Sequence, residues 1–141
     1  MPIRSGFEDR ADQVSQAQIR ALLEKKGANR FMFMEEPDKA TVMFFLDKLL
    51  IKIMLPYPDD RFSASARDRL VRSRWRVLLM MLRMRFEAAE AKISTIEEQF
   101  IGDIVTPDGA TTYEWLRPQI TRMVMDGRMP KTMLAIEGPR S

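Results

Sequence analysis

The sequence contains no cysteine and no histidine. Their absence excludes disulfide bonds, thiol nucleophiles, iron–sulfur clusters and the usual zinc sites, and it removes the side chain that most often acts as a general base near pH 7. The sequence also has no phosphate-binding glycine loop and no nucleophile elbow. We therefore expect no catalytic activity and no cofactor, with a magnesium site built from carboxylates alone as the one alternative that stays open.

Long apolar runs are missing as well. Residues 1–10 carry too many charges for the apolar core of a signal peptide, and the run 40–46 is far shorter than the ~20 residues that span a membrane. These features predict a protein of the bacterial cytoplasm with no membrane partner.

The length of 141 residues, with 45% hydrophobic and 30% charged residues, suits one globular domain. Pro2 and Gly6 in a segment of mixed charge predict a flexible arm over residues 1–10. Residues 129–141 lack any periodicity and predict an extended tail. Residues 11–128 are expected to form a single α+β domain.

The first half predicts an N-terminal helix followed by a three-stranded antiparallel sheet. Apolar residues recur at helical spacing over residues 12–26, and Gly27 stands where a left-handed C-terminal cap belongs. Turn signals follow at residues 35–39 and at Asp47-Lys48. The predicted strands cover residues 30–34, 40–46 and 48–55.

The second half predicts a long basic helix and then C-terminal helices. Ser63 or Ser65 can cap the long helix, and seven apolar residues recur in it at steps of three and four. They fall within an arc of about 80°, which is typical of a helix that packs on a sheet. These residues are Val71, Trp75, Leu78, Leu82, Phe86, Ala89 and Ile93.

Two further helices are expected after this one. Thr95 and Glu98 have the spacing of a capping box, so we expect the chain to kink near Ser94 and a new helix to begin. After a turn at residues 106–109, the last helix spans Thr112–Asp126, where Pro118 is expected to kink it or to begin a new turn.

The net charge is only +3, but the positive charge is concentrated in one segment. Eight arginines and a single acid, Asp68, lie between Arg61 and Arg85. On the long helix they border the apolar stripe, with Arg69, Arg72, Arg76 and Arg83 on one side and Arg67, Arg74 and Arg85 on the other. Guanidinium groups bind phosphates in a bidentate manner, so such a ridge predicts binding to nucleic acid. The alternatives are arginines that cover the core and pair with acids, or an acidic protein partner.

The sheet offers a second basic surface. Phe44 and Phe45 point to opposite sides of the sheet, so one face is core while the other mixes cations with large apolar groups. That second face carries Lys48, Leu50, Lys52 and Met54. Cations beside aromatic rings suit single-stranded nucleic acid, whereas a covering helix or a second subunit is the alternative.

Twelve methionines are the third feature. Met80 and Met84 lie away from the main stripe, so the long helix is apolar on more than one side. Such a helix is central to a fold or buried in an oligomer, and methionine suits adaptable contacts. We expect a homo-oligomer, with plain core filling as the alternative for most of these residues.

Several short segments carry a resemblance to known proteins. They are residues 15–23, 26–28, 55–58, 74–76, 100–105, 107–109 and 115–120. Through these segments the sequence resembles a group of small hypothetical proteins encoded by tailed bacteriophages and prophages. The resemblance covers roughly residues 11–130 and implies a phage origin, with a role in phage DNA metabolism or in countering host defence. The group itself implies no activity and no ligand.

The order of helix, three strands and long helix is also similar to single-strand annealing proteins and, more loosely, to the double-stranded RNA-binding domain. Neither similarity extends to individual residues. Arg67-Asp68-Arg69 stands where the RNA-binding domain has a lysine cluster, and the long helix is longer than the last helix of that domain. A similarity of this kind concerns fold and not function.

Together these features predict a phage-encoded, non-enzymatic, oligomeric protein that binds nucleic acid and favours single-stranded DNA. The alternatives are a protein-interaction module that inhibits a host defence complex and, more weakly, a structural subunit of the virion. The residues expected to bind phosphate are Arg67, Arg69, Arg72, Arg74, Arg76, Lys48 and Lys52.

Overall fold

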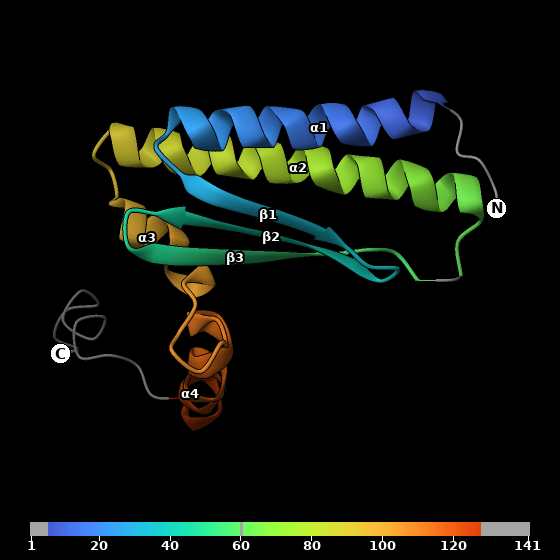
Figure 1. The fold of residues 1–141 in the computed structure, drawn as a ribbon. Coiled ribbons are helices and arrows are strands. Elements are labelled where there is room, and N and C mark those ends of the chain that lie inside the picture. Colours follow the sequence, from blue (N-terminus) through green and yellow to red (C-terminus); the bar gives the residue numbers. More distant parts are fainter. Residues whose placement is uncertain (1–5, 60, 128–141) are drawn as a thin grey trace, which may run out of the picture.

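The computed structural model describes residues 6–59 and 61–127, with side chains from residue 14 onward. It confirms the α+β class and the predicted order of elements (Figure 1). The elements are α1 (Gly6–Lys25), β1 (Asn29–Glu35), β2 (Lys39–Leu46), β3 (Leu49–Pro56), α2 (Ala64–Glu90), α3 (Ile96–Phe100), η1 (Ile101–Asp103) and α4 (Thr112–Asp126).

The main body has two layers, with α1 and α2 side by side on one face of the sheet (Figure 1). The two helices run in the same direction, and an ion pair between Lys26 and Glu90 joins their C-terminal ends. The sheet is antiparallel in the order β1-β2-β3, with tight turns between the strands. Asp47 closes the second turn with a positive φ of 52°, which aspartate tolerates better than most residues.

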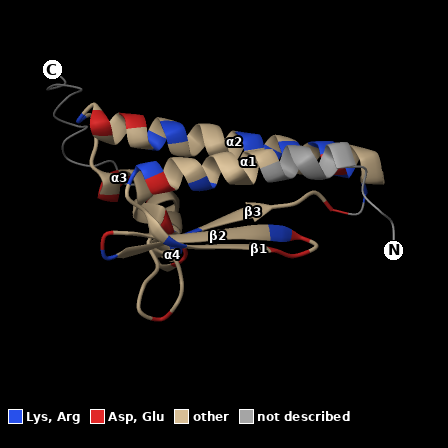
Figure 2. Cartoon of the chain, turned by 45° about the horizontal axis from the view of Figure 1, so that its top comes forward, with Lys and Arg blue, Asp and Glu red and all other residues tan. Residues whose placement is uncertain are grey.

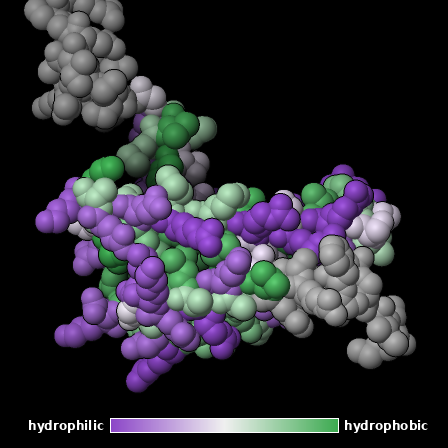
Figure 3. All heavy atoms as spheres, turned by 90° about the horizontal axis from the view of Figure 1, so that it is seen from above, coloured by the Kyte–Doolittle hydropathy of each residue, from purple (hydrophilic) through white to green (hydrophobic). Residues whose placement is uncertain are grey.

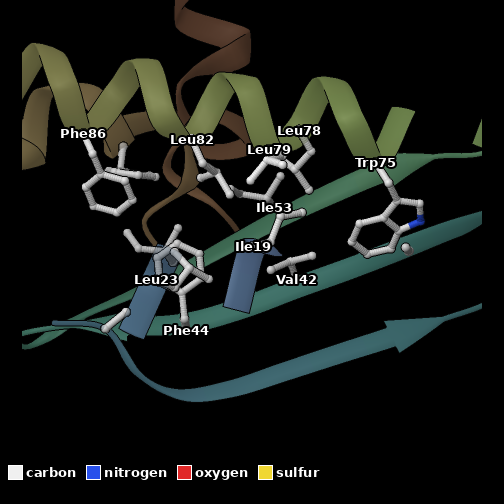
Figure 4. Packing of buried hydrophobic residues seen from close by; sticks show 14 of the residues in the cluster. Ile19, Leu23, Val42, Phe44, Ile53, Trp75, Leu78, Leu79, Leu82 and Phe86 are labelled. Atoms are coloured by element: carbon white, nitrogen blue, oxygen red, sulfur yellow. The ribbon is translucent and has the colours of Figure 1, made fainter. Parts of the chain in front are cut away.

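The predicted apolar stripe of α2 packs against the sheet (Figure 4). Ser63 caps the helix, since its hydroxyl accepts a hydrogen bond from the Ala66 N–H at 3.2 Å. Ile93 is the exception in the stripe because it is 82% exposed. The helix ends at Glu90, where Lys92 takes a left-handed φ of 61° and turns the chain away from the core.

Trp75 lies at the centre of the contact between helix and sheet. It is fully buried, its ring stacks on Phe33 with 6.1 Å between centroids, and its indole N–H donates to the Tyr57 hydroxyl at 3.0 Å. Buried indoles usually need such an acceptor, so this bond fixes the rotation of α2 about its axis.

The C-terminal part is attached to the edge of β3. Thr95 and Glu98 form the predicted capping box, and Phe100 from α3 packs edge-on against Phe44. After η1 the chain pairs briefly with β3, where the Val105 N–H donates to the Leu50 carbonyl at 2.9 Å.

Helix α4 projects from this attachment, below the sheet in Figure 1, and none of its residues is buried. It continues through Pro118 without a new helix beginning there, and Gly127 ends it in a left-handed conformation.

The N-terminal helix is longer than predicted. It begins at Gly6 instead of residue 12, so residues 6–10 of the predicted arm are helical. The next glycine or proline after Gly6 is Gly27, so no strong helix breaker lies between them. Residues 1–5 of the predicted arm and the predicted tail, 129–141, lie outside the described residues. No helix among the described residues is both long and apolar enough to cross a membrane.

The packing of α2 can be tested with two substitutions on the same helix. Leu82 is fully buried, so Leu82→Ala should lower the free energy of unfolding by about 2–5 kcal/mol. Met84 is 64% exposed, so Met84→Ala should change it by less than about 0.5 kcal/mol. Urea unfolding followed by circular dichroism measures both, and similar losses for the two variants would contradict the assigned rotation of α2.

Candidate nucleic-acid interface

The arginines on the β3 side of α2 are held by neighbouring groups, and we call Arg67, Arg74 and Arg85 the clamped arginines. Arg67 donates to the carbonyls of Pro37 and of Pro58, the latter at 3.2 Å, and Arg74 donates to the carbonyl of Pro56. These carbonyls lie at a strand end and in turns, where the ladder leaves them without a partner. A guanidinium supplies the missing donor.

Arg85 forms an ion pair with Asp103, with 2.6 Å between its Nη1 and the carboxylate oxygen, and both side chains are about three-quarters buried. Its guanidinium carbon also lies 5.2 Å from the centre of the Phe100 ring. Arg85 therefore fastens η1 to α2 and is not free to bind an external anion.

The other border of α2 carries three exposed arginines, Arg69, Arg76 and Arg83, which we call the arginine row. They are spaced by seven residues, so they lie nearly in line and about 10 Å apart along the helix axis. Among the side chains of residues 14–59 and 61–127, no hydrogen bond or ion pair involves any of the three, and all three side chains are exposed.

Arg72 lies beside the arginine row but is half-buried. It stands five helical turns before Glu90, which pairs with Lys26 directly after α1, so Arg72 also lies on the side of α2 that faces α1. Its Nη1 is inaccessible to water and has no acceptor among the described residues. This nitrogen is therefore closed to an external anion, whatever the rest of the guanidinium contacts.

Acidic side chains follow the arginine row toward the C-terminal end of α2. Figure 2 shows Lys and Arg along α2 and acidic residues at its C-terminal end, where Glu87 and Glu90 lie. Seen from above, the layer formed by α1 and α2 is mostly hydrophilic, with hydrophobic side chains between the polar ones (Figure 3). The positive surface therefore covers about the first three-quarters of α2, as far as Arg83.

Arg61 does not extend this surface. Its guanidinium contacts the Asp59 carboxylate at 2.8 Å, and its backbone N–H donates to the same side chain at 3.0 Å. The side-chain bond and then the backbone bond hold the pKa of the Asp59 carboxyl below its ordinary value. Both groups are therefore charged near neutral pH and offset one another.

The two predicted lysines lie away from the arginines. Lys48 is exposed in the turn between β2 and β3, beside a cleft that Thr95 and Glu97 also line. Lys52 is half-buried on the sheet face that points away from the helices, which we call the open sheet face. This face is formed by Met32, Met34, Thr41, Met43, Phe45, Leu50, Lys52 and Met54.

The seven predicted phosphate ligands therefore do not form one patch. Arg69, Arg72 and Arg76 lie together, and Arg83 extends their line. Its seven-residue spacing from Arg76 is the sequence signal that identifies it. Arg67 and Arg74 lie on the opposite border of α2 and are occupied by carbonyls.

Two arginines outside the predicted set cover aromatic rings. Arg20 lies over Phe33 with 5.1 Å to the ring centre, and Arg30 lies over Phe45 at 5.5 Å. These pairs join residues on different elements, so no local sequence pattern reveals them. They leave the open sheet face without a bare aromatic ring on which a base could stack.

No set of three or more carboxylates converges on a possible metal site in the described part of the chain. Comparisons with protein-family models, with curated proteins and with solved structures find no match to this chain. The resemblance to phage proteins stays a prediction, and the chemistry of the site must be argued from its geometry.

The two borders of α2 can be distinguished by stability. Arg74→Ala leaves the Pro56 carbonyl without its donor and should lower the free energy of unfolding by about 1 kcal/mol or more. Arg76 is exposed and has no partner among the described residues, so Arg76→Ala should change it by less than about 0.5 kcal/mol. Denaturant unfolding of both variants measures the difference. Equal losses would show that the row is as tightly bound to the protein as the clamped border.

Proposed function

We propose that this protein binds nucleic acid through the arginine row, without catalysing a reaction. The observation that carries the proposal is the line of Arg69, Arg76 and Arg83, which are exposed and unpaired within the described chain. The clamped arginines show that carbonyls and a carboxylate of this chain can occupy a guanidinium, whereas no described group occupies those of the row.

Phosphate is the ligand that best fits this arrangement. A guanidinium keeps its charge at any physiological pH and offers a planar pair of donors that matches phosphate oxygens. Arg69 and Arg83, at the two ends of the row, are about 20 Å apart along the helix axis. Three guanidinium groups spaced in this way match the phosphates of an extended polyanion and not those of a compact one.

The contacts are expected to be independent of base sequence. The aromatic side chains of α2, Trp75 and Phe86, are buried, so the row itself offers no stacking platform. Binding would then come from phosphate contacts and the release of counterions. Whether the protein prefers single-stranded DNA, as the sequence predicts, is decided by comparing its affinity for the two forms of DNA. We propose a role in phage DNA metabolism.

The test is fluorescence anisotropy with labelled single-stranded and double-stranded DNA over a series of salt concentrations. With three phosphate contacts, the slope of log affinity against log salt should be about −3 for duplex and about −2 for single strands. Replacing Arg69, Arg76 and Arg83 by Gln should weaken binding by more than about tenfold and bring the slope close to zero.

The matched control replaces Arg61, Arg117 and Arg122 by Gln, which removes the same charge from positions outside the row. It should leave the affinity within about twofold if binding is local. Absence of binding at low salt, or equal losses in both triple variants, would overturn the proposal. The first result would favour a protein partner.

A further inference from the structure

Helix α2 has a second apolar side that the core does not use. Val77, Met80 and Met84 recur at steps of three and four, so they lie together on one side of the helix. Their exposed fractions are 53%, 50% and 64%, and we call these three residues the outer patch. The residues that pack on the sheet, Trp75 and Leu82 among them, lie on the opposite side of α2 (Figure 4).

The outer patch adjoins the arginine row. Met80 stands four residues after Arg76 and three before Arg83, so its side chain is a neighbour of both on the helix surface. At about 100° per residue, the centre of the patch lies about 75° around α2 from the row, on the side of the clamped arginines. No aspartate or glutamate stands between Arg69 and Phe86, so no carboxylate of this part of α2 repels a polyanion.

The far side of the outer patch borders an open cavity. The cavity has a volume of about 330 Å³ and lies between α2 and β3. Val77 and Met81 line it from the helix, and Met54 and Leu55 line it from the strand. A flat group that rests on the patch therefore has room on this side.

Unpaired bases are the groups that fit an apolar patch beside arginines that bind phosphate. In a single strand each base stands next to its own phosphate with its aromatic face free, whereas in a duplex these faces are stacked inside the helix. The thioether of methionine makes favourable contacts with aromatic rings, and every base has an aromatic face. Such contacts do not depend on the identity of the base.

We infer that a single strand of nucleic acid binds along α2, with its phosphates on the arginine row and its bases on the outer patch. This inference rests on the proposed function, because the row holds the phosphates. Residues 77–84 span about 10 Å along the helix axis, which is the height of about three stacked bases. The bases then lie on α2 beside the row and not on the open sheet face, where the sequence pattern suggested them.

The first test is fluorescence anisotropy of a double variant, Met80→Gln with Met84→Gln, with single-stranded and with duplex DNA. Glutamine keeps the length of both side chains but removes their apolar ends, so binding to the single strand should weaken by about fivefold. The affinity for duplex should stay within about twofold, and the slope of log affinity against log salt should not change for either DNA, because the phosphate contacts remain.

The matched control is Met32→Gln with Met34→Gln on the open sheet face, where these side chains are 47% and 44% exposed. It makes the same chemical change away from the arginine row and should leave both affinities within about twofold. Circular dichroism establishes that both variants are folded.

A single strand without bases supplies an independent readout. An abasic oligonucleotide has the same phosphates as the normal strand, so the wild-type protein should bind it about fivefold less tightly. The variant with Met80→Gln and Met84→Gln has already lost the contact with the bases, so it should bind the two strands equally.

Equal affinity of the wild type for the normal and the abasic strand would overturn this inference. An unchanged affinity for the single strand in the variant at Met80 and Met84, or equal losses for single-stranded and duplex DNA, would overturn it as well. The proposed function would still stand after any of these results if replacing Arg69, Arg76 and Arg83 abolishes binding. Absence of binding to every DNA by the wild type would overturn both.

Discussion

The contact between the apolar stripe of α2 and the sheet determines the rest of the molecule. Trp75 is fully buried in this contact, stacks on Phe33 and donates to Tyr57, which fixes the rotation of the helix. Once this rotation is set, every other side chain of α2 has a defined environment. One border faces β3 and the segment that follows it, and the other lies on the side of α1, which runs beside α2 (Figure 2).

The two borders carry the same residue type but differ in what surrounds them. On the β3 side, proline carbonyls and Asp103 lie within reach of the clamped arginines, which hold turns and η1 to the body. On the other side, Arg69, Arg76 and Arg83 meet no acceptor in the described structure. The arginines of α2 therefore have two roles. The clamped arginines stabilise the fold, and the arginine row forms a positively charged surface.

Much of the fold could be predicted because its signals are local. The stripe of α2, the capping box at Thr95 and the glycine caps depend on residues a few positions apart. Which arginines stay exposed could not be predicted from the sequence. Which arginines are clamped depends on the carbonyls of Pro37, Pro56 and Pro58, which come from other parts of the chain. Periodicity also predicts α4 but not that none of its residues is buried.

The most direct test of the account observes individual guanidinium groups. In a two-dimensional NMR spectrum of the arginine Nε–Hε groups, titration with a DNA oligonucleotide at low salt should shift the signals of Arg69, Arg76 and Arg83. The signals of Arg67 and Arg74 should stay in place, because their donors are held by carbonyls. Shifts confined to the clamped arginines, or no shift at all, would contradict the claim that the exposed row binds phosphate.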